Sequence, residues 1–378
     1  MTIAARTVPV PLTRVIAATL TLPVPLAVIA RLPEYSAAPQ STVPLLFRAS
    51  SNESAYPAAS AVVRAAQAAV AMSNRYPVIN ATDVITAVAG FVGVAPAAIA
   101  VADGALSLLQ HVLSAYVHPG QEVIYAWRSY EAYPICVQLA GGIPRQVSLT
   151  SAHEHDLDGM LAAIGANTAA VILCNPNNPT GTAFGRHELI RFLDRVPSHV
   201  VVVYDEAYRD FVDPARIAPF ESSDLLARYP NLIALRTFSK VYSLAGMRVG
   251  YLIASETIAG IVRRVIPPFP LTAASAAAAI AALDEDDARL QVVSGVHEER
   301  ERVITALATA GYVAAPSHGN FVWLPIGADA EPFARHLRES GIAIRAFPGD
   351  GARISLGEPG LAEALTAALA SRPGRAVR

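Results

Sequence analysis

The stretch HVVVVYDEAY, residues 199–208, reads as a short, uniformly apolar strand that ends in a carboxylate. A run of valines without polar alternation is typical of a strand buried on both faces, as in a parallel sheet between layers of helices. Asp205 follows directly, and a buried carboxylate is costly unless a partner offsets its charge. A helix N-cap or an ion pair would explain Asp205 as well as a functional role would. The stretch therefore predicts a parallel α/β sheet and leaves the purpose of Asp205 open.

Apolar runs on either side of this stretch alternate with helical patterns. The further strands that we expect are EVIYAW (122–127), AAVILCNP (169–176), NLIALRTF (231–238) and RVGYLIAS (248–255). Helices are expected near residues 104–116, 130–140, 157–165 and 186–195. Buried strands joined by helical crossovers predict a mainly parallel sheet with helices on both faces.

The pattern changes after PPFPLTAAS (267–275). The later elements that we expect are a long helical stretch over 273–310, NFVWLP (320–325), a helix near 331–340 and GARISLG (351–357). Together they predict a second, smaller α+β domain. The expected organisation is an N-terminal extension or arm (1–30), a segment joining the small domain (31–58), a large domain (59–268) and a small C-terminal domain (269–378).

Composition excludes several classes of protein. Hydrophobic residues make up 53% of the 378-residue chain, and because much of this is alanine it fits a soluble α/β protein. The formal net charge of −2 gives no basis for binding nucleic acid or anionic lipid. The two cysteines, Cys136 and Cys174, lie in apolar runs and suggest a reduced compartment. We expect no metal site.

The apolar run VIAATLTLPVPLAVIA (15–30), preceded by Arg6 and Arg14, loosely resembles a signal peptide. Pro23 and Pro25 interrupt this run, no clear cleavage site follows it, and it is too short to span a bilayer. We therefore expect a packing arm or an over-extended start. The expected location is cytoplasmic, without a membrane partner.

Lys240, in TFSKVYSLAGMRVG (237–250), is the only lysine among the 29 lysine and arginine residues of the chain. It follows a predicted strand, and ligands of α/β sheets bind at the carboxyl ends of strands. A solvated surface lysine is the ordinary alternative. Arginine replaces lysine on most surfaces, however, and its guanidinium cannot form a Schiff base. The lone lysine is therefore a candidate nucleophile.

A third strand end carries the turn CNPNNPTG (174–181), whose amides and asparagine side chains can face a ligand. As a turn alone it would be unremarkable. Together with Asp205 and Lys240, it places amide groups, a carboxylate and an amine at successive strand ends. Schiff-base chemistry on a pyridine ring needs an amine nucleophile and an acid that keeps the ring nitrogen protonated.

The motifs NPNNPTG, YDEAY, TFSK followed by AGMRVG, and a late R-x-S-x-G occur in that order. Over residues 31–370 the sequence resembles the fold-type I pyridoxal-phosphate aminotransferases (class I/II), within them most closely the histidinol-phosphate and aromatic amino-acid aminotransferase branch. The resemblance implies an aspartate-aminotransferase-like large domain with a seven-stranded type of sheet, which binds pyridoxal 5'-phosphate, and a smaller α+β domain.

The resemblance implies roles around the cofactor ring for individual residues. Lys240 would form the Schiff base and act as general acid–base, and Asp205 would pair with the pyridinium nitrogen. Asn178 and Tyr208 would hydrogen-bond the phenolic oxygen, while Tyr130 in WRSYEAY would stack on the ring. We expect Lys240, Asp205 and Tyr208 to be the catalytic residues. For Tyr130 an ordinary core position is an equal alternative.

The resemblance also implies a site for the cofactor phosphate. Its members would be the side chains of Thr237, Ser239 and Arg248 and the backbone amides of Gly104, Ala105 and Leu106. A helix N-terminus with a glycine at its entrance suits a phosphate. Tyr56 matches a tyrosine that reaches the phosphate from the partner subunit, which implies a homodimer with shared active sites.

Recognition of the substrate is expected to depend on arginines. Arg353 in GARISLG matches the arginine that binds the substrate α-carboxylate, a task that suits a bidentate guanidinium. Arg345 in GIAIRAF matches an arginine near the distal end of the substrate, and Tyr35 matches a tyrosine of the N-terminal arm. Asn178 is a further expected contact. The stretch NESAYP (52–57) departs from the family's N-E-N-P-Y-G, which leaves the substrate open.

These expectations describe an aminotransferase that moves an amino group between an amino donor and a 2-oxo acid or oxo-phosphate. Histidinol phosphate or an aromatic amino acid, with glutamate and 2-oxoglutarate, are the expected substrates. A decarboxylase or lyase of the same fold would use the same residues, because substrate pose decides which bond breaks. A non-catalytic ligand-sensing protein is a third interpretation, but the first thirty residues contain no basic helix-turn-helix.

Overall fold

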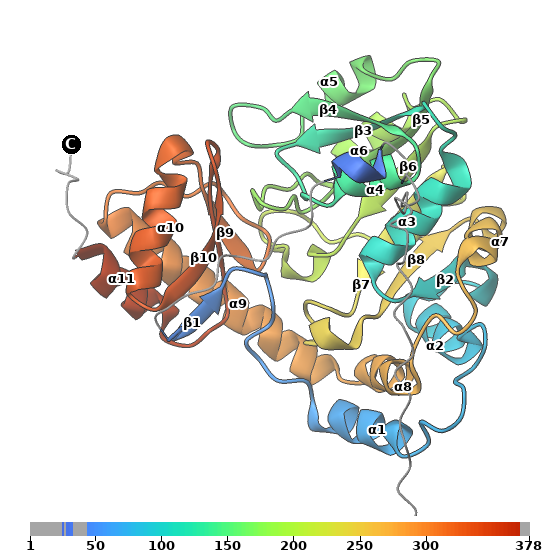
Figure 1. The fold of residues 1–378 in the computed structure, drawn as a ribbon, viewed down its shortest axis with the longest axis horizontal. Helices are drawn as coiled ribbons and strands as arrows, with labels where there is room; N and C mark the ends of the chain where they lie inside the picture. The colour runs from blue at the N-terminus through green and yellow to red at the C-terminus, as the bar shows by residue number, and fades with distance from the viewer. Residues whose placement is uncertain (1–24, 26–27, 33–43, 371–378) are drawn as a thin grey trace, which may run out of the picture.

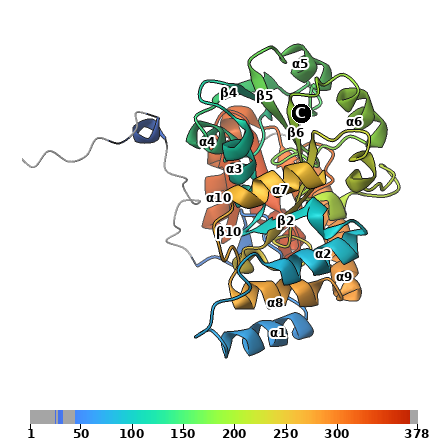
Figure 2. The same ribbon diagram turned by 90° about the vertical axis from the view of Figure 1, so that its right-hand side faces the viewer.

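Two β-sheets, each packed against helices, organise the chain (Figures 1 and 2). The structure, a computed structural model, describes residues 25, 28–32 and 44–370. Tyr35 and most of the predicted N-terminal arm therefore lie outside the described residues. Within the described ranges, no helix is both long enough and apolar enough to cross a bilayer.

The larger sheet has seven strands and is mainly parallel, as predicted. Its strands in spatial order are β2 (Ile99–Ala102), β8 (Gly250–Ala254), β7 (Leu232–Thr237), β6 (Val201–Asp205), β5 (Thr168–Cys174), β3 (Glu122–Trp127) and β4 (Ile143–Ser148). Only β8 runs antiparallel to its neighbours among these strands. The carboxyl ends of β5, β6 and β7 therefore lie side by side at one edge of the sheet.

Helices cover both faces of this sheet. One face packs against α3 (Ala105–Tyr116), α4 (Tyr133–Leu139) and α7 (Glu256–Val265). The opposite face packs against α1 (Ser60–Val70), α2 (Thr82–Val92) and α8 (Ala273–Ala282) near β2 and β8, and against α5 (Leu157–Ala162) and α6 (Arg186–Leu193) near β3 and β5. The apolar strand residues alternate between these helical layers, which explains why the strands read as continuous apolar runs.

Two strands of this sheet were not predicted. β4 is an edge strand whose sequence, IPRQVS, is largely exposed, so it lacks the apolar run that marks the central strands. β2 is fully buried but only four residues long, IAVA, and such a short run does not distinguish a strand from a helix.

The smaller sheet has four strands and lies beside the C-terminal helices (Figure 1). Its strands in spatial order are β1 (Phe47–Ala49), β10 (Ile342–Phe347), β11 (Gly351–Ser355) and β9 (Phe321–Leu324). The helices that pack on it are α9 (Asp286–Thr309), α10 (Ala330–Glu339) and α11 (Leu361–Ala370). β1 pairs parallel with β10, so an N-terminal strand completes a sheet built mostly from the C-terminal third of the chain.

The predicted helical stretch over 273–310 is two helices rather than one. α8 ends at Ala282 and α9 begins at Asp286. The small residues of α8 pack in the core of the large sheet, whereas α9 packs against the small sheet, so the chain changes direction between them. Asp286 and Asp287 in the first turn of α9 stabilise a new helix start. The predicted domain limits stay a prediction.

Candidate active site

A cavity of about 950 Å³ lies where the carboxyl ends of the large-sheet strands meet the small sheet. We call it the main cavity. Most of the residues predicted from the sequence line it: Ala105, Leu106, Tyr130, Asn178, Asp205, Tyr208, Thr237, Ser239, Lys240, Arg248, Arg345 and Arg353. Gly104 and Tyr56 do not, and Tyr35 lies outside the described residues. The fold thus brings together side chains that lie far apart in the sequence.

Asp205 ends strand β6 and faces this cavity. Its Oδ2 accepts a 2.7 Å hydrogen bond from the Tyr133 hydroxyl, and its Oδ1 accepts a 3.1 Å hydrogen bond from the Ala207 amide. Among the described residues, no cation forms an ion pair with this carboxylate. Burial raises the pKa of Asp205, although the hydrogen bond from Tyr133 opposes that rise. Among the described residues, Asp205 therefore meets two hydrogen-bond donors rather than an ion-pair partner, and its role in the site stays a prediction.

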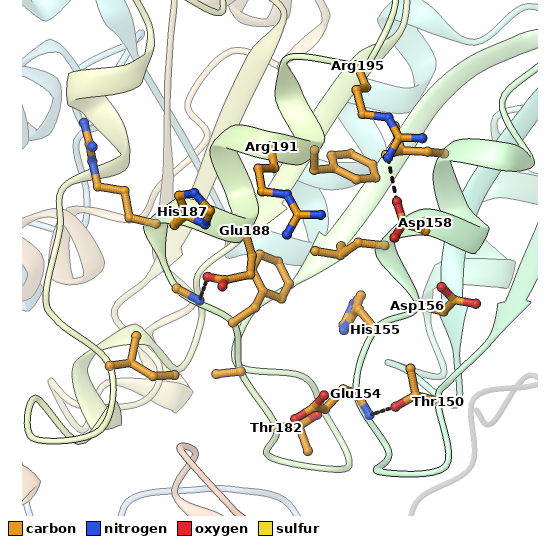
Figure 3. Close-up of a pocket in the computed structure, with 18 of the residues that line it drawn as sticks. Thr150, Glu154, His155, Asp156, Asp158, Thr182, His187, Glu188, Arg191 and Arg195 are labelled. Carbon is orange, nitrogen blue, oxygen red and sulfur yellow. Dashed lines mark hydrogen bonds and ion pairs between the residues drawn. The ribbon is translucent and has the colours of Figure 1, made fainter.

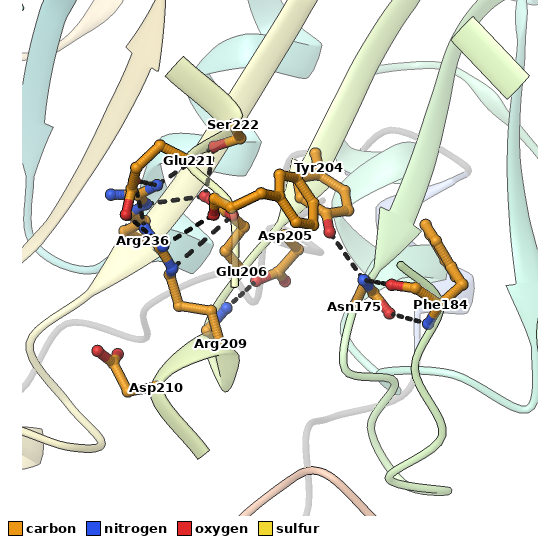
Figure 4. A network of polar contacts seen from close by, with 12 residues as sticks. Asn175, Phe184, Tyr204, Asp205, Glu206, Arg209, Asp210, Glu221, Ser222 and Arg236 are labelled. Atoms are coloured by element: carbon orange, nitrogen blue, oxygen red, sulfur yellow. Dashed lines mark hydrogen bonds and ion pairs between the residues drawn. The ribbon is translucent and has the colours of Figure 1, made fainter. Parts of the chain in front are cut away.

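The neighbouring carboxylate, Glu206, points to the opposite face of the strand and is fully paired (Figure 4). Arg236 donates to Glu206 Oε2 at 2.8 Å through its Nε and to Glu221 Oε2 at 2.8 Å through its Nη2. Arg209 makes a bidentate pair with Glu221, at 2.6 and 2.9 Å. These four residues, which we call the β6 ion cluster, hold the chain that leaves β6 in place. Although burial raises the pKa of Glu221, Arg209 and Arg236 lower it to about 2.

Lys240 is partly buried and projects into the main cavity from the loop after β7. Its Nζ donates a 3.0 Å hydrogen bond to the Asn52 carbonyl and lies 5.7 Å from the centroid of the Tyr208 ring. Burial, and next the positive charge of Arg353, lower the pKa of Lys240 to about 8. The surface-lysine interpretation is therefore wrong, and the ε-amine is far more often neutral than that of an ordinary lysine.

The N-terminus of α3 forms an anion-binding cradle at one end of the cavity. Gly104 has φ +108°, and a Cβ there would lie 2.6 Å from Nη2 of Arg248. Gly250 is equally constrained, because a Cβ there would lie 2.4 Å from the Ala105 amide nitrogen. Both glycines let Arg248 and the free amides of α3 converge. A helix N-terminus beside an arginine stabilises a phosphate.

Two hydroxyls complete this cradle. Thr237 Oγ1 accepts a 3.0 Å hydrogen bond from the Ser239 amide, which closes the turn between β7 and Lys240. Arg248 reaches back to the same turn through hydrogen bonds to the Ala245 carbonyl at 3.2 Å and to Ser239 Oγ at 3.5 Å. The turn that presents the lysine is therefore also the turn that presents donors to an anion.

Two asparagines of the 174–181 turn stabilise the turn itself, and a third faces the main cavity. Asn175 donates to the Tyr204 hydroxyl at 2.7 Å, and Asn177 donates to Thr180 Oγ1 at 2.8 Å. Asn178 instead lines the main cavity, where its Oδ1 accepts a 2.6 Å hydrogen bond from Arg353 Nη1. The turn is thus more than a connection between elements, because its internal hydrogen bonds aim one amide at the cavity.

Tyr56, predicted to serve the partner's site, lies beside α9 rather than in the main cavity of its own chain. A Cβ at Gly295 would overlap the Tyr56 hydroxyl, so this helix leaves room for the tyrosine only because it has a glycine there. The role of Tyr56 stays a prediction.

Three residues of the site had no predicted role. Asn52 is buried with φ +53°, and it connects Lys240 to Tyr208, since its carbonyl accepts from Lys240 and its Nδ2 donates to the Tyr208 hydroxyl at 3.0 Å. Tyr133 holds Asp205, and Glu131 forms a 3.0 Å ion pair with Arg345. All three residues belong to stretches that the sequence analysis had already singled out, NESAYP and WRSYEAY. The sequence does not show, however, which residues of each stretch face the site.

A second cavity of about 800 Å³ lies beside α6 (Figure 3). His187, Arg191 and Arg195 from α6 line it, and Arg195 forms a 2.5 Å ion pair with Asp158 across it. Buried His155 packs edge-on against Phe184, and burial lowers its pKa to about 4. None of the predicted site residues that the structure describes lines this second cavity.

Comparison with known proteins identifies the family. The family described as aminotransferase class I and II matches residues 47–369, a span that takes in both sheets. The chain belongs to this family. An aromatic amino acid aminotransferase of Streptomyces coelicolor is 43% identical over 315 residues, which cover 83% of this chain and 87% of that protein. One of Rhodococcus jostii is 42% identical over 339 residues, which cover 90% of this chain and 94% of that protein.

Solved structures agree with this assignment. A histidinol-phosphate aminotransferase from Sinorhizobium meliloti, solved in complex with pyridoxal-5'-phosphate, has a TM-score of 0.79 and 31% identity, over 86% of this chain and 90% of that one. An aspartate aminotransferase from Thermus thermophilus, solved with maleate, has a TM-score of 0.71 at 23% identity, over 85% of this chain and 89% of that one, and supports the fold alone. The predicted fold-type I aminotransferase architecture and the predicted transaminase class are confirmed.

Proposed function

We propose that this aminotransferase uses pyridoxal 5'-phosphate and acts on aromatic amino acids. One observation carries the proposal: the only lysine of the chain lies in one cavity with a buried carboxylate, an anion-binding helix N-terminus and Arg353. The cofactor carries an aldehyde, a basic ring nitrogen, a phenolic oxygen and a phosphate. The main cavity offers a partner of suitable chemistry to each of these groups, so the residues present fit the cofactor.

Each partner would hold the cofactor in a separate way. Asp205 would face the ring nitrogen, and Asn178 and Tyr208 the phenolic oxygen, while Tyr130 would pack on the ring. The phosphate partners would be Thr237, Ser239, Arg248 and the amides of Ala105 and Leu106. The amide of Gly104, which was also expected to contribute, donates instead to the Ala102 carbonyl at 2.7 Å. A cationic ring nitrogen would offset the charge of the buried Asp205 carboxylate, whose pKa burial raises.

Lys240 would be both attachment point and proton carrier. Bound pyridoxal 5'-phosphate would supply an electron sink for the carbanion at the substrate Cα. With a pKa of about 8, the Lys240 amine is neutral in roughly a tenth of molecules at pH 7, far more than an exposed lysine. Its Nζ would attack an aldehyde readily, and once released it would remove the substrate Cα proton as a general base.

The substrate class is supported by the relatives and by the arginines. The Streptomyces and Rhodococcus proteins, both above 40% identity, are named aromatic amino acid aminotransferases. Arg353 would bind the α-carboxylate, since its Nη1 and Nη2 donate to two neutral oxygens, of Asn178 and Ser50, and a carboxylate is a stronger acceptor. Histidinol phosphate is the second candidate, because Arg345 also lines the cavity and because the Sinorhizobium enzyme carries that name.

The test is a single half-reaction followed by visible absorbance. The cofactor-loaded protein is mixed separately with phenylalanine and with histidinol phosphate, and loss of the absorbance band of the attached cofactor is timed. We expect phenylalanine to react faster. If histidinol phosphate reacts much faster, the aromatic assignment is wrong, and release of carbon dioxide from either substrate would favour the decarboxylase alternative. A protein that binds ligands without turnover in either case would be a sensor.

We also propose a homodimer with shared active sites. Tyr56 lies outside the main cavity of its own chain, where it packs beside Gly295 of α9, so a role at a phosphate site would be in the cavity of a second copy. Tyr76 is 83% exposed and stacks on Phe269 at 4.6 Å, so an apolar pair lies open to a second copy. Co-expressed Lys240→Ala and Tyr56→Ala chains should regain activity, because one of the two hybrid sites contains neither change. No recovery would contradict shared sites.

A cytoplasmic role in amino-acid biosynthesis completes the proposal. Cys136 and Cys174 are both buried and form no disulfide, which suits a reducing compartment. Fractionation of cells that express the tagged full-length chain would test the location. Recovery in the membrane or periplasmic fraction would contradict it.

A further inference from the structure

Asn52 lies buried in the wall of the main cavity, in the segment that leads from β1 to α1. The residue is only 1% exposed. Its backbone φ is +53°, in the left-handed region that asparagine adopts more readily than most other residues with a side chain. Its polar groups are therefore withdrawn from water and need partners within the protein.

The backbone of Asn52 binds residues from both sheets. Its carbonyl accepts hydrogen bonds from Lys240 Nζ at 3.0 Å and from Asn320 Nδ2 at 3.2 Å, and its amide donates to Ser355 Oγ at 2.8 Å. Asn320 directly precedes β9 and Ser355 ends β11, whereas Lys240 lies in the loop after β7. The backbone of Asn52 therefore connects the small sheet to the loop that carries the lysine.

The side-chain amide of Asn52 has a defined orientation. Ser355 Oγ accepts from the backbone amide of Asn52, so its own hydrogen can be donated to Asn52 Oδ1, 2.9 Å away. With Oδ1 on the side of Ser355, Nδ2 faces the Tyr208 hydroxyl and donates to it at 3.0 Å. An amide turned the other way would leave the hydrogen of the buried Ser355 hydroxyl without this acceptor.

The Tyr208 hydroxyl consequently keeps its own hydrogen for a ligand. A phenol oxygen carries one hydrogen, and among the described residues the hydroxyl of Tyr208 accepts from Asn52 and donates to no protein group. Burial raises the pKa of Tyr208, although the charge of Arg353 opposes that rise, so the hydroxyl stays protonated. Its ring packs edge-on against Phe321, with the centroids 5.0 Å apart. Tyr208 is therefore a held donor in the wall of the main cavity.

We infer that Asn52 is a positioning residue for Tyr208: by donating to the hydroxyl oxygen, it leaves the hydroxyl hydrogen directed to the phenolic oxygen of the bound cofactor. The inference rests on the proposed function and deepens it. Accepting a hydrogen bond also polarises the O–H group and makes it a stronger donor. A donor at the phenolic oxygen draws negative charge from it, and this charge would otherwise stabilise the protonated nitrogen that joins Lys240 to the cofactor. Through Tyr208, Asn52 should therefore keep that nitrogen neutral more often.

Two variants separate this role from a purely structural one. Asn52→Gly removes the side-chain amide but keeps the backbone carbonyl and amide, and glycine adopts φ +53° without strain. Asn320→Ala is the matched control, because it removes a second buried asparagine amide whose hydrogen bond goes to Asn52 rather than to Tyr208. Both variants should lose stability, since each removes buried hydrogen bonds. Only Asn52→Gly should change the donor strength of Tyr208.

The readout is a pH titration of the visible absorbance band of the cofactor-loaded protein without substrate. In Asn52→Gly the pKa read from this band should rise by about 0.5, and in Tyr208→Phe it should rise by about 1 or more. The double variant Asn52→Gly/Tyr208→Phe should titrate like Tyr208→Phe alone, because Asn52 acts through the hydroxyl. Asn320→Ala should titrate like the unchanged chain.

The inference would be overturned if Asn52→Gly titrated like the unchanged chain, or if it added a further shift to that of Tyr208→Phe. An equal shift in Asn320→Ala would also overturn it, because loosening of the whole site would then explain the result. Absence of a visible band in the unchanged chain loaded with pyridoxal 5'-phosphate would contradict the proposed function. A normal band with the same titration in Asn52→Gly would contradict this inference alone.

Discussion

The two faces of strand β6 handle buried charge in opposite ways. On one face, Glu206 belongs to an ion cluster in which two carboxylates meet two arginines at hydrogen-bonding distance (Figure 4). On the other face, Asp205 and Lys240 line one cavity without forming an ion pair, and burial shifts both pKa values toward the neutral forms. Asp205 and Glu206 are adjacent in sequence, and strand alternation alone separates their environments.

The difference between these two faces separates buried charges that stabilise the fold from buried charges that are suited to binding a ligand. The β6 ion cluster is already balanced, so it contributes to a single arrangement of the chain and has no need of a partner. The cavity charges are costly in the cofactor-free protein, and their cost is offset only when a ligand supplies the complementary groups. Substitutions on the two faces should therefore have opposite effects on stability and on activity.

The largest effect is expected at Lys240. Lys240→Arg keeps the charge but removes an amine that can attach the cofactor, so turnover should fall by at least about 10⁴-fold. The purified variant should also lack the visible absorbance band of covalently attached cofactor. Steady-state kinetics and an absorbance spectrum check both. Normal transamination by this variant would refute the assignment of Lys240.

The next effect is expected at Asp205. Asp205→Asn keeps the size of the side chain but removes the charge that would face the ring nitrogen, so kcat/KM should fall by about 10³-fold. The cofactor should still attach, because Lys240 is intact. Kinetics of phenylalanine transamination and the absorbance spectrum measure the two properties separately. A loss of less than about tenfold would mean that another group keeps the ring nitrogen protonated.

The opposite face should respond in stability rather than in activity. Glu206→Gln leaves Arg236 without one of its two carboxylate partners, each 2.8 Å away, in a pair whose side chains are 7% and 3% exposed. The free energy of unfolding should fall by about 3 kcal/mol, while kcat/KM for phenylalanine changes by less than about threefold. Urea unfolding of the cofactor-loaded protein checks the first value. Glu188→Gln, at an exposed carboxylate of α6, is the control and should change little.

Some features of the fold and the site could be predicted from the sequence, and others could not. The valine run before Asp205 predicted a buried strand, and the rarity of lysine predicted a special role for Lys240. Both features can be read from the composition and order of the residues alone. The edge strand β4 was not predicted, since its polar, exposed sequence carries no apolar run. Nor was the break between α8 and α9, which depends on the two cores against which they pack.

Within the site, position along the chain did not reveal pairing. Tyr133, which holds Asp205, and Glu131, which pairs with Arg345, both lie in WRSYEAY beside the predicted Tyr130. Which of these side chains faces a carboxylate or an arginine is set by contacts between segments 70 to 220 residues apart, such as Tyr133 with Asp205 and Glu131 with Arg345. Only the folded chain defines such contacts. The family motifs led to the cavity but not to the partners of its charges.

The smallest effect sharpens the comparison through pH. Burial lowers the pKa of Lys240 from 10.5 to about 8 in the cofactor-free protein, so below pH 8 the charged amine destabilises the fold. Between pH 8 and 10.5 the unfolded chain holds more protons than the folded one, and stability from this residue rises with pH until the cost disappears. Because part of the side chain faces the open cavity, Lys240→Met should stabilise the cofactor-free protein by about 2 kcal/mol at pH 7. Relative to the unchanged chain, the gain should shrink at pH 9.5, because the unchanged chain itself becomes more stable there. Lys240→Arg, which stays charged, should have about the stability of the unchanged chain at pH 7 and become less stable than it at pH 9.5. Urea unfolding at the two pH values measures this difference, and a gain independent of pH would mean that packing, rather than charge, explains it.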